Sequence, residues 1–172
     1  MVNRKYWGFF SGVIVALLLN TTSFSLAGQY TIQQESLRDL KGIYISVESL
    51  SPGIQKDGLT KNRIHKDMEL MLRKAGINIL SKKEWFDTEG SPCLYVNPHV
   101  LKLPATSEYI YSINISFKQT VYPARKPVEI TGAATWTTGG IIGITPDLDK
   151  IRASVKAQVE EFIKAYLAVN PE

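Results

Sequence analysis

The 172-residue chain has a single cysteine, so it cannot form an internal disulfide. Its stability must therefore come from a hydrophobic core, which a chain of this length is able to build. The cysteine, Cys93, begins an apolar stretch. This position favours a buried small side chain, and the alternative is a reactive or intermolecular thiol.

Histidine is nearly as scarce, with two residues in the whole chain. His65 and Glu69 share a helical face at i, i+4, but two ligands do not make a zinc site, and Asp67 between them points elsewhere. His99 has no obvious serine or cysteine partner, so a nucleophile, a base and an orienting group do not stand at a recognisable spacing. We therefore predict no catalytic residue, no metal ligand and no cofactor, and we expect that the protein is not an enzyme.

Neither sign of charge dominates the sequence. The chain has 20 Lys and Arg residues against 16 Asp and Glu residues, and its formal net charge is +4. Two of the basic residues, Arg4 and Lys5, lie at the N-terminus, and the short basic groups elsewhere are interrupted by acids such as Asp67 and Glu84. This pattern is typical of solvated helix faces, so it predicts no nucleic-acid partner.

The N-terminal apolar run, residues 7–19, is shorter than the roughly 20 residues needed to cross a hydrocarbon core. It follows two basic residues and precedes the small-residue sequence at 25–27. This order is typical of an export signal that is cleaved after Ala27. We predict that residues 1–27 are a signal peptide and that the mature protein is periplasmic or secreted, with no transmembrane helix after cleavage.

Residues 26–28 resemble the front of a bacterial lipobox, the motif that directs a lipid to a cysteine. The position that must hold this cysteine is occupied by Gln29. Because there is no thiol to acylate, we predict that the protein carries no lipid anchor.

The first half of the mature region predicts a strand, a helix and a second strand. Residues 28–39 are polar and predict a short leader or a brief helix, so the domain is placed at residues 40–172. Alternating apolar residues at 42–50 predict a strand that a Ser-Pro-Gly sequence ends. An apolar stripe predicts a helix at 60–76, and the apolar residues 77–80 follow as a strand. Such a unit pairs its strands in parallel, with a right-handed crossover.

The second half predicts extended segments followed by a long helix. Pro98 cannot donate to a strand ladder, so it predicts an edge position or a bulge. Phe117 lies on the packed face of the most regular strand, and we expect it to share a core with Phe162 of the final helix. The predicted elements are a short helix that begins after Ser81, strands at 94–103, 109–121 and 128–137, and a helix at 146–168.

These elements predict an α+β fold, a two-layer α/β sandwich. Its β-α-β unit is followed by an antiparallel three-stranded meander and a long C-terminal helix. Both main helices are expected on one face of a mixed sheet, which leaves the rim and the other face of the sheet free. Gly132 and Ala134 are expected on the packed face, where their small size would admit either a close helix or a ligand.

The order of elements resembles the small α/β domains of bacterial envelope proteins. These are the amino-terminal domain of TolB, the CsgG-like domains, the LpoB-like activators of penicillin-binding proteins and the auxiliary lipoproteins of ABC-type transporters. The similarity covers residues 40–167 and includes the strand entry at 40–48 and the helix end at 72–77. It implies a mostly non-catalytic domain that docks other envelope proteins, although a fold does not determine a function.

The most unusual segment lies before the final helix, where Gly139 and Gly140 are followed by Ile141, Ile142 and Ile144. It resembles part of a phosphate loop, but it lacks the first glycine of G-x-G-x-x-G and the lysine of a P-loop. Acidic residues at the start of the next helix would also repel a phosphate. The isoleucines are therefore interpreted either as a plug over the end of the core or as an exposed contact patch.

Taken together, these patterns predict an exported, non-enzymatic protein that serves as an interaction or accessory domain and binds another cell-envelope protein. The expected contact surface is a sheet edge marked by Pro98 or the loop 139–145. One alternative is a periplasmic small-molecule or lipid-binding module, with its pocket between the sheet and the final helix over Gly132 and Ala134. A further alternative is an envelope hydrolase, although no particular residue of the sequence supports it.

Overall fold

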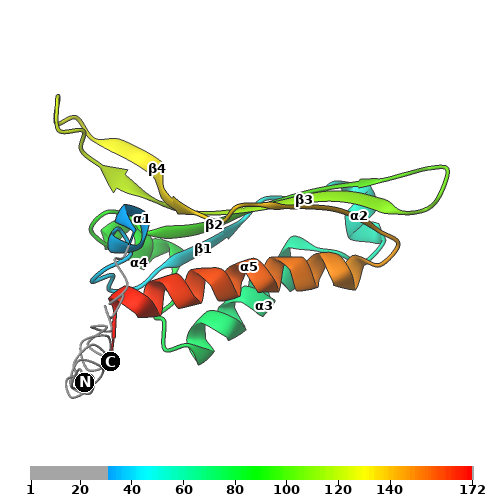
Figure 1. The fold of residues 1–172 in the computed structure, drawn as a ribbon, viewed down its shortest axis with the longest axis horizontal. Coiled ribbons are helices and arrows are strands. Elements are labelled where there is room, and N and C mark those ends of the chain that lie inside the picture. Colours follow the sequence, from blue (N-terminus) through cyan, green and yellow to red (C-terminus); the bar gives the residue numbers. More distant parts are fainter. Residues whose placement is uncertain (1–30, 172) are drawn as a thin grey trace, which may run out of the picture.

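The structure is a computed structural model in which residues 31–171 are described. The predicted signal peptide and its cleavage site lie outside the described residues. The described chain forms one mixed sheet with helices packed against it, which confirms the predicted α+β fold (Figure 1).

The sheet contains five strands, of which only the first pair is parallel. β2 pairs with β1 on one side and with β3 on the other, and β4 and β5 pair with consecutive parts of β3 on its far side. The predicted meander is therefore present, but β5 was expected to be a loop. The strands are β1 (Tyr44–Val47), β2 (Cys93–Lys102), β3 (Tyr109–Val121), β4 (Ile130–Thr137) and β5 (Ile141–Thr145).

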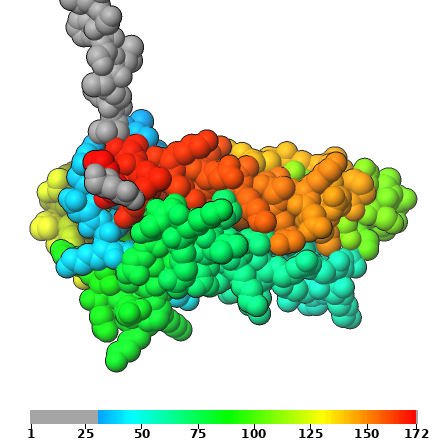
Figure 2. Space-filling model, turned by 90° about the horizontal axis from the view of Figure 1, so that it is seen from below, coloured from blue at the N-terminus to red at the C-terminus, as the bar shows by residue number. Residues whose placement is uncertain are grey.

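Two helices cover one face of the sheet, α3 (Lys61–Lys74) and α5 (Leu148–Val169). They lie on the same side in Figure 1, and Figure 2 shows them next to each other across that side of the molecule. The Thr60 side chain caps α3 by accepting a hydrogen bond from the Arg63 amide, as its position before the apolar stripe predicts. Two shorter helices, α2 (Pro52–Lys56) and α4 (Lys82–Asp87), connect these elements.

The core fills the space between the sheet and the two long helices. Phe117 of β3 and Phe162 of α5 are both fully buried, with ring centroids 5.8 Å apart, so the predicted shared core is confirmed. Trp136 of β4 meets the Phe162 ring edge-on at 5.3 Å. Aromatic pairs of this kind add to the stability that burial of apolar area provides.

The strand predicted at 77–80 is reduced to a single parallel bridge between Ile43 and Ile79. The Ile43 amide donates to the Asn78 carbonyl, and the Leu80 amide donates to the Ile43 carbonyl. The expected parallel direction is therefore correct, although the segment is too short to form a regular strand. It lies beside the outer edge of β1.

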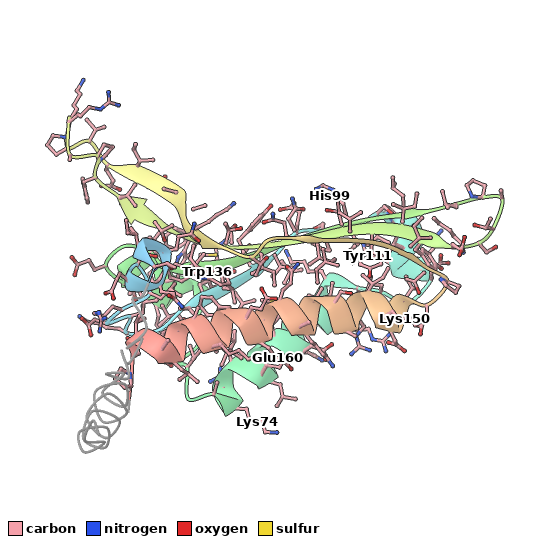
Figure 3. All side chains as sticks on the ribbon, in the orientation of Figure 1. Lys74, His99, Tyr111, Trp136, Lys150 and Glu160 are labelled. Carbon is pink, nitrogen blue, oxygen red and sulfur yellow. The ribbon has the colours of Figure 1, made fainter. Side chains whose placement is uncertain are left out.

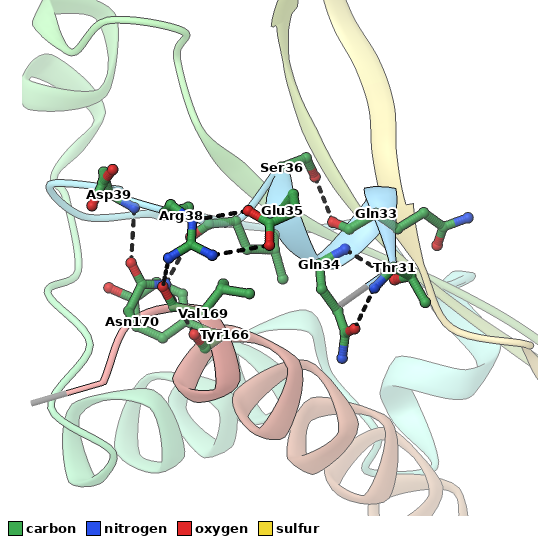
Figure 4. A network of polar contacts seen from close by, with 11 residues as sticks. Thr31, Gln33, Gln34, Glu35, Ser36, Arg38, Asp39, Tyr166, Val169 and Asn170 are labelled. Atoms are coloured by element: carbon green, nitrogen blue, oxygen red, sulfur yellow. Dashed lines mark hydrogen bonds and ion pairs between the residues drawn. The ribbon is translucent and has the colours of Figure 1, made fainter. Parts of the chain in front are cut away.

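The part of the predicted leader that the structure describes packs onto the domain. It forms the one-turn helix α1 (Ile32–Glu35), and Leu37 just after it is fully buried. Figure 4 shows how this segment meets the end of α5: Arg38 Nη1 donates to the Val169 carbonyl, and the Asp39 amide donates to Asn170 Oδ1. The brief-helix alternative is thus the one observed, and this helix belongs to the packed domain.

The alternation expected along β4 is interrupted. Phe117 faces Trp136 in the register of β3 and β4, but the next residue, Lys118, faces Ala134, so one residue of β4 is skipped by a β-bulge. A one-residue shift moves the following side chains to the other face of the sheet. Ala134 is consequently exposed, and the prediction that it shares the packed face with Trp136 is wrong.

Candidate binding surface on the open face of the sheet

The face of the sheet opposite α3 and α5, which we call the open face, is not covered by either of these two helices. His99 of β2 lies on it and points away from α5, whereas Tyr111 and Trp136 point toward α5 (Figure 3). The Tyr111 hydroxyl lies 3.1 Å from Ser154 Oγ of α5. Strand alternation therefore separates a packed face from an accessible one.

The glycine- and isoleucine-rich segment is an edge strand, not a loop. Ile141 is half-buried toward the core, whereas Ile142 and Ile144 are 82% and 61% exposed on the open face. Gly139 and Gly140 form the exposed break between β4 and β5. Ile142 and Ile144 are therefore exposed, as the contact-patch interpretation expects. They do not plug the end of the core.

Four side chains form one apolar patch on the open face. In the register of the three strands, Leu101 lies opposite Ile110, and Ile110 lies opposite Ile144. Ile142 lies two residues from Ile144 on the same face, and all four side chains are exposed. Large apolar side chains gathered in this way mark an interaction site more often than single exposed ones do. We call Leu101, Ile110, Ile142 and Ile144 the isoleucine patch.

Pro98 has a different role from the one that the sequence predicted. The part of β2 that contains it pairs with β3, and no strand of residues 31–171 pairs with its other side, because β1 pairs only as far as Val96. The prediction of an edge position is thus correct. Its side chain, however, is buried on the packed face, so Pro98 is not a contact residue.

A buried glutamine holds the break between β4 and β5 in place. Gln158 of α5 is 1% exposed, and its Nε2 donates to the Ile113 carbonyl of β3 at 3.2 Å. Its Oε1 accepts a hydrogen bond from Thr138 Oγ1 at 3.0 Å. Gly140 adopts a φ of 72° at this break, a value that favours glycine. Gln158 therefore joins α5 both to β3 and to the break, and it provides hydrogen-bond partners for two polar groups in the core.

A cavity on the open face lies at the end of the sheet opposite the isoleucine patch. It has a volume of about 540 Å³ and extends across the strands, from α4 on one side to the start of β4 on the other. We call it the aromatic cavity because Trp85, Phe86 and Tyr95 line it. The other lining residues are Ser46, Ser91, Cys93, Lys118, Thr120, Glu129, Thr131 and Gly132.

The floor of the aromatic cavity is held by a chain of polar contacts. The Tyr95 hydroxyl donates to Glu48 Oε2 at 2.8 Å, and the Lys118 ammonium lies 3.5 Å from the centroid of the Tyr95 ring. This distance is typical of a cation–π interaction. Burial raises the pKa of the Tyr95 hydroxyl, and the hydrogen bond to Glu48 raises this pKa further. Tyr95 therefore stays neutral.

Stacking fixes one wall of the cavity. The Trp85 ring stacks on Tyr44 of β1, with centroids 4.8 Å apart and an angle of 16° between the planes. Its indole N–H is buried and has no acceptor among the described residues. The Ser81 capping box, which the sequence predicts, begins α4 and so places Trp85 and Phe86 beside the sheet.

Cys93 lies under the cavity and is a protected thiol. It is buried, and burial raises the pKa of the thiol to about 11 even though Lys118 lowers it. A thiol reacts as its thiolate, and this form is rare at neutral pH under these conditions. The predicted buried side chain is therefore confirmed.

Labelling kinetics check this assignment. At pH 8 we expect a chromogenic aromatic disulfide to modify native Cys93 at least about a hundredfold more slowly than the same residue in guanidinium, because the thiolate is scarce and shielded. The matched control is His99→Cys combined with Cys93→Ala, which places a thiol at an exposed position on the same face of the same strand. Equal rates for native Cys93 and this control would contradict the assignment.

The structure does not bring the histidines and the cysteine together. His65 lies on α3, where its Nδ1 is 3.9 Å from Glu69 Oε2, while Asp67 turns toward α5 and pairs with Arg152 at 2.7 Å. Cys93 and His99 are six residues apart on β2, or roughly 20 Å. Within residues 31–171, no three His, Cys, Asp or Glu side chains gather in a way that could hold a metal ion.

The pocket proposed from the sequence is not where it was expected. Gly132 lines the aromatic cavity, which lies on the face of the sheet opposite α5, and Ala134 is exposed. The β-bulge explains the difference, because it breaks the pattern that placed both residues under the helix. The sequence does carry one signal of the cavity: Tyr95 and Lys118 alternate with core residues and must therefore share the other face.

None of the described helices combines the length and the apolarity that a membrane span requires. Comparison with known proteins leaves the resemblance to envelope domains as an expectation. No protein-family model, curated protein or solved structure was found to match the chain.

Proposed function

We propose that the protein is an exported, non-enzymatic interaction domain that binds an extended segment of another cell-envelope protein along β5. The observation that carries this proposal is the isoleucine patch beside an unpaired strand edge. β5 pairs with β3 on one side, and no described strand pairs with its other side. An edge of this kind offers backbone donors and acceptors to an added strand.

The side chains on β5 specify what the added strand should look like. Ile142 and Ile144 alternate with Ile141 and Gly143, so they present two apolar contacts on the open face. A strand paired with β5 would place every second side chain beside them. The partner segment is therefore expected to carry apolar side chains at alternate positions.

A short extended segment fits this edge better than a second copy of the chain does. β5 has five residues, and beyond the break at Gly139 and Gly140 the hairpin of β3 and β4 bends away from the plane of the sheet (Figure 1). A single segment needs only β5, whereas a second copy would also have to accommodate that hairpin.

The experiment compares proteins captured from the native envelope by three forms of the chain. Ile142→Lys with Ile144→Lys places charges on the edge and is expected to reduce capture of the partner at least tenfold. Because both residues are exposed, each change should alter the free energy of unfolding by less than about 0.5 kcal/mol. Leu70→Lys is the matched control, since Leu70 is 70% exposed but lies on α3.

A synthetic peptide from the captured protein then tests the mode of binding. It should slow amide hydrogen exchange in β5 of the wild type and of Leu70→Lys, and it should have no such effect on the double variant. Equal capture by all three forms, or protection away from β5, would sink the proposal. A dimer that the double variant dissociates would show instead that the occupant is a second copy.

A further inference from the structure

We propose that the aromatic cavity is a second, independent binding site, and that it takes a flat, largely apolar small molecule carrying an anionic group. The cavity volume of about 540 Å³ falls within the range that small-molecule pockets occupy. Its lining combines three aromatic side chains with a few hydroxyls and two charged groups, as such pockets commonly do.

The aromatic side chains define the shape of the ligand. Trp85 and Phe86 form the wall on α4, with ring centroids 4.7 Å apart, and the Trp85 ring is held by its stacking on Tyr44. The Tyr95 ring lies in the floor, where the Glu48 bond fixes its hydroxyl end. The Trp85 ring is held in place by the fold, so a planar ligand can lie against it and the neighbouring Phe86 at a small cost in conformational entropy, above the floor that Tyr95 forms.

Lys118 defines the charge of the ligand. Its ammonium lies over the Tyr95 ring at 3.5 Å, and no described carboxylate lies within 4 Å of it. The other charged lining residue, Glu129, stands on the β4 side and accepts a hydrogen bond from the Tyr122 hydroxyl at 3.4 Å. An anionic group is therefore expected next to Lys118 in the floor, with the apolar part of the ligand directed toward Trp85 and Phe86.

The aromatic cavity and the isoleucine patch are separate. The cavity uses Cys93, Tyr95 and Lys118, whereas the patch uses the distant ends of the same strands around Leu101 and Ile110. The cavity proposal therefore does not depend on the docking of a protein at β5, and one can fail without the other.

Two fluorescent probes with the same aromatic skeleton test the site. Anilinonaphthalene sulfonate combines a planar naphthalene ring with an anionic sulfonate, and phenylnaphthylamine lacks the sulfonate. We expect both probes to bind the native protein saturably at one site and to accept energy from excited Trp85. Lys118→Gln should weaken the sulfonate probe about tenfold, because it removes a charge-assisted contact, and should leave the neutral probe within about twofold.

Three further variants locate the binding. Trp85→Ala and Ser46→Phe should each weaken both probes at least tenfold, the first by removing a wall and the second by filling the cavity from the floor. Ser46→Phe retains all the aromatic lining and suits a strand position, so it keeps the test valid if the Trp85 variant loses α4. The double lysine variant at Ile142 and Ile144 should bind both probes as the wild type does.

The outcomes separate the alternatives. Binding that is lost in the double lysine variant and retained in Ser46→Phe would place the probes on the isoleucine patch and overturn the cavity site. If Lys118→Gln weakens the binding of both probes equally, or leaves the binding of both unchanged, the anionic part of the proposal is overturned. The absence of saturable binding by the natively folded wild type would overturn all of it.

Discussion

Phe162→Ala is expected to lower the free energy of unfolding by about 4 kcal/mol, because it empties the centre of the core. The side chain is 0% exposed and contacts aromatic rings from two strands and from its own helix. The ring centroids of Phe117, Trp136 and Tyr166 lie 5.8, 5.3 and 6.3 Å from that of Phe162. Rigid rings on several sides cannot close the space that the missing ring leaves, so we expect the full loss of roughly 3 to 5 kcal/mol that such a change usually costs.

Equilibrium unfolding in urea, followed by far-ultraviolet circular dichroism, measures this effect. Small domains have a total stability of about 5 to 15 kcal/mol, so the variant is expected to unfold at a much lower urea concentration. Phe86→Ala is the matched control, because this phenylalanine is 63% exposed and its loss should cost less than about 1 kcal/mol. A Phe162 variant that is as stable as this control would show that α5 does not share the core with β3.

The core could be predicted from the sequence because it depends on local periodicity. The stripe that contains Phe162 and the alternation that contains Phe117 each indicate which side of an element is apolar. Two apolar faces in one small domain must cover each other, so their contact follows without knowledge of the strand order. The same reasoning correctly placed both long helices, α3 and α5, on one face of the sheet.

The two candidate sites depend on features that local periodicity does not contain. The segment with Gly139 and Gly140 has the composition of a loop, and it becomes a strand because Gln158, many residues later in the chain, supports the break before it. The aromatic cavity depends on a β-bulge opposite Lys118 and on α4 lying beside the sheet. Register shifts and the placement of short helices are set by tertiary contacts. The sequence therefore placed Ile142 and Ile144 in a candidate contact segment, but it did not show that this segment is an edge strand, and it did not locate the aromatic cavity.

Gln158→Leu is expected to lower the free energy of unfolding by about 3 kcal/mol, although leucine matches glutamine closely in size. The loss arises because the Ile113 carbonyl remains in the core without the Gln158 amide that donated to it. The Thr138 hydroxyl also loses its shorter hydrogen bond, at 3.0 Å, and keeps only the contacts with the Ile115 backbone at 3.4 Å. Urea unfolding measures the overall effect. Hydrogen exchange is expected to show the largest increase in β5 amides, because the break that Gln158 holds lies immediately before this strand.

Thr138→Val removes the hydroxyl that donates to Gln158, so it serves as the control for this hydrogen bond. Combined with Gln158→Leu, it removes both members of one hydrogen bond and should destabilise the protein by less than the sum of the two single changes, as a double-mutant cycle measures. Strict additivity, or a uniform rise in exchange across the sheet, would show that Gln158 does not act on this break. If β5 does loosen in Gln158→Leu, capture of the envelope partner should also weaken even though Ile142 and Ile144 are unchanged, since an added strand needs an ordered edge to pair with.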